Sequence, residues 1–295
     1  MKRKMTKFIF TLVLLAAAWR FFSLSGKNEP GWERNQDSKG SRLYGEALSW
    51  EEAKTLFPVY VSAYLTDVDT GKRFQVQRRG GTYHADVQPL TAEDTRVLRG
   101  IYGDRWSWQR RAVVLEAGFR RIAASINGMP HGAGKIRGND FPGHFCVHFL
   151  NSRTHASGKV DTAHQMMVWK AAGQPEKPFL QAGPEQAVWL VFTAFDQDDA
   201  GIASLGLDDS EASYWLVGQK MLGRLPRMAI DKLSLLEKEA GADCKVYRLQ
   251  LSLYYPGESG KRTRSGEIAV ARNGLAGRWL LKSDSLRAIV DQNLK

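Results

Sequence analysis

Short stretches in which apolar and polar residues alternate dominate the first half of the chain, and this period of two is typical of β-strands. Four segments show strand character: 59–76, with a turn at 69–71, then 112–116, 121–126 and 144–150. Helix signals are fewer, and each begins at a capping residue: Ser49, Thr91 or Asp161. The pattern predicts a β-rich domain over 49–173.

The second half of the chain combines helical spacing with one long alternation. A Gly/Pro-rich stretch, 174–184, predicts a linker between two domains. Helices are expected over 185–198 and 227–241, and strands over 247–255, 267–271 and 278–282. We therefore expect a small α+β domain over 185–295, in which helices precede an antiparallel meander. This arrangement resembles the cone of nuclear-transport-factor-like modules.

The amino terminus has the pattern of an export signal. Lys2, Arg3, Lys4 and Lys7 precede a mostly apolar run, 8–18, that closes on three alanines. Residues 1–26 are therefore predicted to be a signal peptide or, if uncleaved, a membrane anchor, and 27–48 a polar linker. The cationic flank predicts that the rest of the chain lies outside the cytoplasm.

The net charge limits the classes of binding partner, and the number of cysteines limits the disulfide and zinc sites that the chain can form. The chain has 42 Lys plus Arg against 31 Asp plus Glu, a net charge of +11, which favours an anionic partner. Because the leader predicts export, we expect a cell-wall peptide or peptidoglycan and no nucleic acid. Two cysteines exclude a multiply disulfide-bonded scaffold and a four-cysteine zinc site, although Cys146 and Cys244 remain able to form one bridge.

All six histidines fall between residues 84 and 164, and three candidate groups lie on one strand. In the run 143–149, alternation places His144, Cys146 and His148 on one face and apolar side chains on the other. A nearby imidazolium favours the thiolate form of a cysteine, which is the nucleophile. The alternative is a structural cysteine flanked by two surface histidines. His164, inside the last helix of this domain, is expected at the surface.

The pair His131–Gly132, followed by the segment 143–148, resembles the catalytic signature of L,D-transpeptidases (YkuD-like), a His-Gly loop followed by Ser/Thr-His-Gly-Cys-hydrophobic-Arg/Asn on a strand. Gly143, Phe145 and His148 stand where the signature has Ser/Thr, Gly and Arg/Asn. The resemblance covers about residues 59–150.

The resemblance implies an L,D-transpeptidase-like domain that needs no cofactor and acts on peptidoglycan stem peptides. Cys146 would be the nucleophile, His131 its general base, and His144 a support for the thiolate. Gly132 and His148 would contact substrate. Independently of the resemblance, Arg153, in the polar segment 151–155 after the strand, could orient a substrate carboxylate, because a guanidinium binds carboxylates in pairs of hydrogen bonds; alternatively this segment is a polar turn.

Two other functions remain open from the sequence. His84 and Asp86 have the close spacing of metal ligands and, with His131 and His148, would hold zinc in a peptidoglycan peptidase. Alternatively, His84 and Asp86 belong to a turn. A non-catalytic wall-binding protein would instead use an aromatic and basic cluster of Trp106, Trp108, Arg110 and Arg111.

Overall fold

The computed structural model describes residues 43–155, 157–236, 241–272 and 277–291. The predicted leader, 1–26, and the predicted linker up to residue 42 lie outside these ranges. Among the described residues, none of the helices combines the length and the apolar character needed to cross a membrane.

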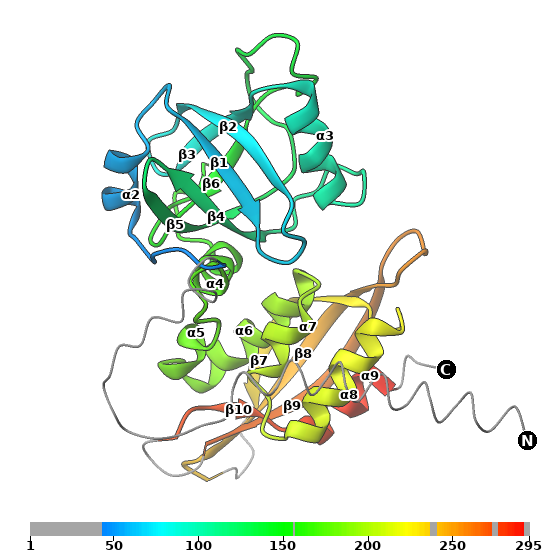
Figure 1. The fold of residues 1–295 in the computed structure, drawn as a ribbon. Coiled ribbons are helices and arrows are strands. Elements are labelled where there is room, and N and C mark those ends of the chain that lie inside the picture. Colours follow the sequence, from blue (N-terminus) through cyan, green and yellow to red (C-terminus); the bar gives the residue numbers. More distant parts are fainter. Residues whose placement is uncertain (1–42, 156, 237–240, 273–276, 292–295) are drawn as a thin grey trace, which may run out of the picture. The chain divides into compact units, whose positions relative to one another are not determined.

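Six antiparallel strands close into a barrel in the order β1-β2-β3-β6-β5-β4 (Figure 1). Their bounds are β1 Ser62–Asp67, β2 Arg73–Gly80, β3 Ala85–Pro89, β4 Arg111–Ala117, β5 Arg120–Ile126 and β6 Phe145–His148. Helices α2 (Trp50–Leu56) and α3 (Ala92–Ile101) accompany the barrel, and α4 (Thr162–Ala171) packs against its strands β4 and β5. Capping boxes at Ser49 and Thr91 begin these helices, as the sequence predicts.

The barrel interior is filled by alternate side chains of its strands. Leu65, Val76, Leu115 and Ile126 have no solvent exposure, and the rings of Phe74 and Phe145 lie with centroids 6.3 Å apart. Removal of this apolar surface from water is the main stabilisation of the barrel.

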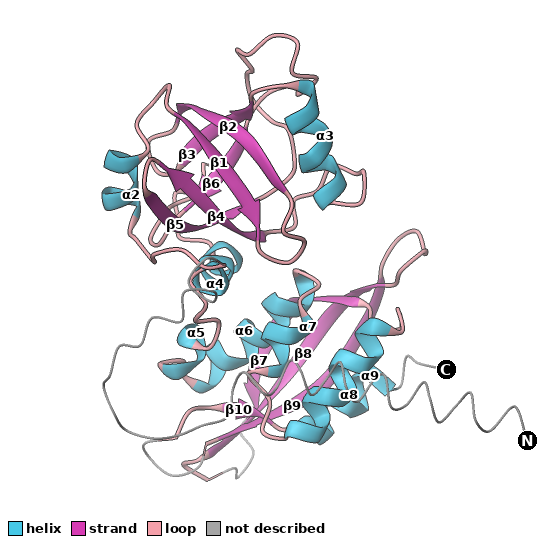
Figure 2. Ribbon diagram, viewed as in Figure 1, coloured by secondary structure: helices cyan, strands magenta, loops and turns pink. Residues whose placement is uncertain are grey.

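The second half of the chain forms an antiparallel sheet in the order β10-β9-β8-β7, with helices against one face (Figure 2). Its strands are β7 Arg227–Leu236, β8 Cys244–Tyr254, β9 Arg262–Ala271 and β10 Leu280–Leu281. The helices from residue 162 onward are α4 Thr162–Ala171, α5 Lys177–Leu180, α6 Pro184–Asp196, α7 Ala200–Ser204, α8 Ser210–Met221 and α9 Ser283–Asp291. The predicted architecture, a β-rich region followed by helices and an antiparallel meander, is confirmed at this level. The structure also contains elements that the sequence reading omitted: β3, α5, α7, α8 and α9.

The predicted helix over 227–241 is wrong, because residues 227–236 form β7. This strand pairs with β8 from Arg227 opposite Tyr254 to Leu236 opposite Val246, with a register shift between Ile230 and Lys232. A bulge inserts one extra residue and so breaks the period of two. The resulting spacing of apolar residues imitates a helical period.

The predicted linker, 174–184, contains the short helix α5 and packs into the core. Phe179 has no solvent exposure and joins the same hydrophobic cluster as Val191 of α6 and Leu251 of β8. The Gly/Pro-rich composition of this segment therefore accompanies tight turns around a buried ring.

The barrel core can be tested with two phenylalanines of opposite exposure. We expect Phe74→Ala to lower the free energy of unfolding by about 3–5 kcal/mol, because Phe74 is 2% exposed and its removal leaves a cavity. Phe119→Ala, at a side chain that is 107% exposed in the turn after β4, is the matched control, with an effect within about 0.5 kcal/mol. Urea unfolding of both variants measures the difference, and equal losses would contradict the placement of Phe74.

Candidate active site

The pairing of β3 with β6 sets Asp86 directly opposite Cys146 on the barrel wall. Phe145 and Val147, the neighbours of Cys146, point into the apolar core. Successive side chains of a strand alternate faces, so Cys146 points outward, as the sequence predicts. Strand alternation therefore separates the titratable side chains from the packed interior.

The loop that carries His131 is pinned beside the start of β6. The backbones of His131 and His144 exchange two hydrogen bonds, with N–O distances of 2.9 and 2.8 Å. Gly132 has φ +59°, and a Cβ there would lie 2.4 Å from Cε1 of His144. Gly143 has φ +119°, and a Cβ there would lie 2.5 Å from the carbonyl oxygen of His131. Both positions thus require glycine, for backbone conformation and for space.

Three polar side chains fix the rest of this loop, and sequence reasoning missed them. Oε1 of Gln88 accepts a hydrogen bond from the amide of Lys135 at 2.7 Å. Nδ2 of Asn139 donates to the carbonyl of Pro89 at 2.8 Å, and Oγ1 of Thr95 donates to the carbonyl of Asn139 at 2.6 Å. Because Gln88 and Thr95 lie far from the loop in sequence, no motif marks them in advance.

His131 and Cys146 lie within hydrogen-bonding distance, with 3.2 Å between Nε2 and Sγ. Nδ1 of His131 lies 2.9 Å from the carbonyl oxygen of Met129. A carbonyl only accepts, so Nδ1 carries a proton, and in the neutral ring the free electron pair is on Nε2. The imidazole is therefore oriented to accept the proton of the thiol.

Cys146 is buried and only 4% exposed, which disfavours the charged thiolate. Burial, together with the negative charge of Asp86, raises the pKa of the Cys146 thiol far above its usual value. Burial also lowers the pKa of His131, which favours the neutral imidazole. Both directions run against the thiolate–imidazolium pair that the sequence predicts.

A cluster of imidazoles surrounds Asp86. Oδ1 of Asp86 lies 3.0 Å from Nε2 of His155, 3.2 Å from Nε2 of His84 and 3.8 Å from Nε2 of His144. Burial alone would raise the pKa of Asp86, but the hydrogen bond with His84 and the charges of the surrounding histidines outweigh it, and the pKa is lowered. Asp86 is therefore a carboxylate at neutral pH. His155, which sequence reasoning did not assign to a site, belongs to this cluster.

The contacts of His144 are with the loop, the carboxylate and the predicted base. Its Nδ1 donates to the carbonyl of Ala133 at 3.1 Å, and its Nε2 faces Asp86 without a hydrogen-bond partner. Its ring centroid lies 4.6 Å from that of His131. His144 thus packs against the predicted base and faces the carboxylate.

His148 and His164 form a buried stack below the cluster. The ring of His148 lies between those of His84 and His164, with centroid distances of 4.4 and 3.7 Å. His148 is only 2% exposed, so its side chain cannot make the substrate contact that the sequence predicts. The expectation that His164 is a surface residue is wrong, because it is 1% exposed and bonds Oγ of Ser125 at 2.9 Å. Burial lowers the pKa of both histidines well below the usual value.

The predicted substrate contact Arg153 and the four predicted zinc ligands do not all lie together in the structure. Arg153 is exposed, and its carbonyl oxygen lies 2.6 Å from Nδ1 of His84. Of the four predicted zinc ligands, His84 and Asp86 lie together with His155, whereas His131 lies beside Cys146 and His148 lies in the stack. This is a different ligand set from the predicted one.

The aromatic and basic cluster does not form one binding surface. The rings of Trp106 and Phe141 lie edge to face, 5.4 Å apart. Arg110 pairs with Asp161 at 2.9 Å and Arg111 with Asp67 at 2.7 Å, so these cations are neutralised within the fold. Trp108 is 51% exposed, and its ring centroid lies 5.3 Å from that of His131, so it flanks the predicted base.

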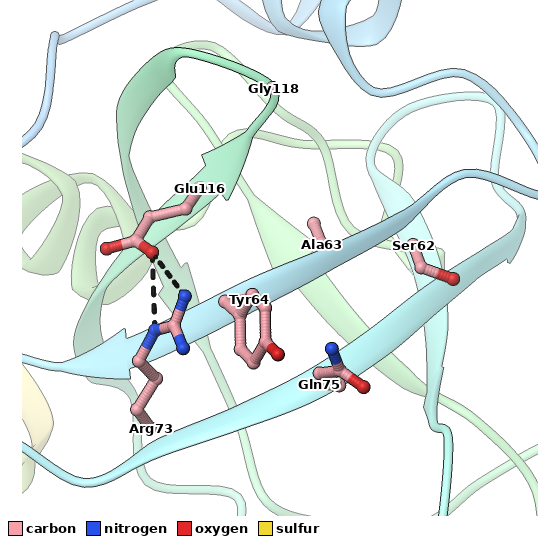
Figure 3. A pocket seen from close by; sticks show the side chains of 7 residues that line it. All are labelled: Ser62, Ala63, Tyr64, Arg73, Gln75, Glu116 and Gly118. Carbon is pink, nitrogen blue, oxygen red and sulfur yellow. Dashed lines mark hydrogen bonds and ion pairs between the residues drawn. The ribbon is translucent and has the colours of Figure 1, made fainter.

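A surface hollow of about 340 Å³ lies on the outer wall of the barrel, away from the residues described above (Figure 3). Its lining consists of Ser62, Ala63, Tyr64, Arg73, Gln75, Glu116 and Gly118. The guanidinium of Arg73 lies 3.3 Å above the ring of Tyr64 and pairs with Glu116 at 2.8 Å. Its one cation is already paired, and neither a cysteine nor a histidine lines it, so the hollow offers less chemistry than the surroundings of Cys146.

No protein-family model matches the chain, and a search of curated proteins finds no match. The assignment of chemistry therefore depends on the geometry of the residues.

The two cysteines are free thiols, which provides a test of the neutral sulfur. We expect iodoacetamide at neutral pH to modify Cys244 faster than Cys146. Cys244 is partly exposed at the start of β8, whereas Cys146 is buried with a raised pKa. Peptide mass spectrometry over time measures both rates, and faster alkylation of Cys146 would show that its sulfur is already ionised and accessible.

Proposed function

We propose that this protein is an enzyme that transfers acyl groups through a thioester on Cys146. The observation that carries the proposal is the separation of 3.2 Å between Sγ of Cys146 and Nε2 of His131, together with the bond that leaves Nε2 able to accept a proton. A nucleophile and an oriented base within hydrogen-bonding distance are the minimum equipment for this chemistry.

The reaction proceeds by general-base catalysis. As Sγ of Cys146 attacks the carbonyl carbon of an amide, its proton moves to Nε2 of His131, and the carbonyl oxygen takes up the negative charge. Collapse of this intermediate breaks the C–N bond, and His131 returns the proton to the leaving amine. An incoming amine or water then attacks the thioester and releases Cys146 as a thiol.

The proposed substrate is the stem peptide of peptidoglycan, cleaved next to a D-residue. Support comes from the resemblance of His131–Gly132 and the segment 143–148 to L,D-transpeptidases, and from the export pattern at the amino terminus. The net charge of +11 favours an anionic cell wall. The glycine at 143, where that family has Ser/Thr, fits a backbone with φ +119°.

Substitution of the two central residues tests the proposal. With purified muropeptides as substrate, we expect Cys146→Ser to reduce turnover to background and His131→Gln to reduce it by about 10²–10⁴-fold, the contribution of a general base. Cys244→Ser, which removes the other thiol, is the matched control and retains wild-type turnover. Release and exchange of the terminal residue are followed by mass spectrometry. Turnover by Cys146→Ser would contradict a sulfur nucleophile, and tight binding without turnover by the wild type would favour a binding protein.

The pH dependence tests which form of the pair reacts. Because protonated His131 cannot accept the thiol proton and burial lowers its pKa, we expect kcat/KM to fall only below the ordinary histidine value of about 6.5. Above that value the rate is expected to stay level, since the thiol remains protonated. A rate that is low at pH 7 and climbs tenfold per pH unit toward pH 9 would indicate a thiolate nucleophile and contradict general-base catalysis.

A further inference from the structure

Three potential metal ligands converge on one point beside Cys146. Nε2 of His84 and Nε2 of His155 lie 2.8 Å apart, and each lies near Oδ1 of Asp86, at 3.2 and 3.0 Å. Sγ of Cys146 lies within 4.8 Å of all three atoms. The two nitrogens and the carboxylate oxygen each have an electron pair that can bind a metal. Without a metal, hydrogen bonds through protons on the nitrogens must account for these short distances.

The spacing approaches that of a tetrahedral metal centre. A zinc ion with bonds of about 2.0–2.3 Å holds its ligand atoms about 3.3–3.7 Å apart. The three short separations, 2.8, 3.0 and 3.2 Å, differ from this edge by about half an ångström. Small side-chain rotations would therefore bring these three atoms to the edge length of such a centre.

His84 is oriented as a ligand from behind. Its Nδ1 donates to the carbonyl oxygen of Arg153 at 2.6 Å, which fixes the ring and directs Nε2 into the cluster. Metal-bound histidines almost always have such a hydrogen bond on the second nitrogen. The stack with His148, 4.4 Å away, holds the same ring from its face.

We propose that His84, Asp86 and His155 bind a zinc ion, with Sγ of Cys146 as the fourth ligand. Two imidazoles, one carboxylate and one thiolate match the preference of Zn²⁺ for nitrogen and sulfur donors and exclude Mg²⁺, which requires oxygen. On binding, the thiol proton and any proton on the two Nε2 atoms pass to solvent.

A second group of histidines is the weaker candidate. His131, His144 and His155 also bring one nitrogen each within 4.8 Å of one another. This group has no anionic donor, and Nε2 of His131 already contacts Sγ of Cys146. The carboxylate of Asp86 and the thiol therefore select the first group.

The metal and the thioester would use the same sulfur. Coordination to zinc withdraws electron density from the sulfur and makes it a weaker nucleophile, so we expect the metal-bound protein to be less active than the metal-free protein. This consequence, unlike the binding of zinc, rests on the proposed function.

Zinc titration of the full-length protein against a chromogenic chelator tests the site. We expect one high-affinity Zn²⁺ per chain and no competition by Mg²⁺. His155→Gln is expected to weaken binding by about 100-fold or more, because even residues that only orient a ligand contribute roughly 10- to 100-fold. The side chain of His155 is 49% exposed, so this change leaves the core intact. Unchanged affinity in His155→Gln, or absence of a stoichiometric site in the wild type, would overturn the proposal.

Cobalt distinguishes the sulfur ligand from the nitrogen ligands. Co²⁺ bound to the wild type and to Cys244→Ser should show a near-ultraviolet thiolate-to-metal band that Cys146→Ser lacks. A band that depends on Cys244 would contradict the assignment. These readouts need no turnover, so zinc binding with no activity on muropeptides would refute the proposed function alone. Turnover by the wild type with no zinc binding would refute the metal site alone.

Discussion

The chemistry of this protein depends on one strand pairing, that of β3 with β6 in the closed barrel. The pairing puts Asp86 opposite Cys146 and turns both side chains away from the apolar interior. The barrel core determines the register, because a slip by one residue would send Phe145 outward and the cysteine inward. The packing of hydrocarbon side chains thus fixes the position of a sulfur, a carboxylate and the histidines that meet them.

The surroundings of Cys146 and His131 favour a neutral thiol and a neutral imidazole over a thiolate–imidazolium ion pair. Cys146 and His131 both lose water on folding, and their pKa values move in opposite directions, the thiol upward and the imidazole downward. Under the proposed function, charge separation would then occur only when a substrate carbonyl can take up the negative charge. A site of this kind protects its sulfur from unspecific alkylation and oxidation, at the cost of a slower encounter with small electrophiles.

Local periodicity predicted a large part of the fold, and for a physical reason. Side-chain alternation around Cys146 is a property of a single strand, and capping boxes at Ser49 and Thr91 are properties of a single turn. Gln88 escaped prediction because it lies 47 residues before Lys135, its partner in the loop, and the meeting of His155 with Asp86, 69 residues earlier in the chain, likewise depends on the path of loops. The bulge in β7 escaped for a different reason, since one extra residue changes an alternating pattern into one that resembles a helix.

The closure of the barrel restricts how a peptide can be recognised. An open sheet can bind a peptide as an additional strand along its exposed edge, and main-chain hydrogen bonds then supply the affinity. Each of the six described barrel strands has a neighbouring strand on both sides, so none of them offers an exposed edge. Under the proposed function, a peptide would therefore be bound by the side chains and loops around His131 and could not extend the barrel sheet as an added strand.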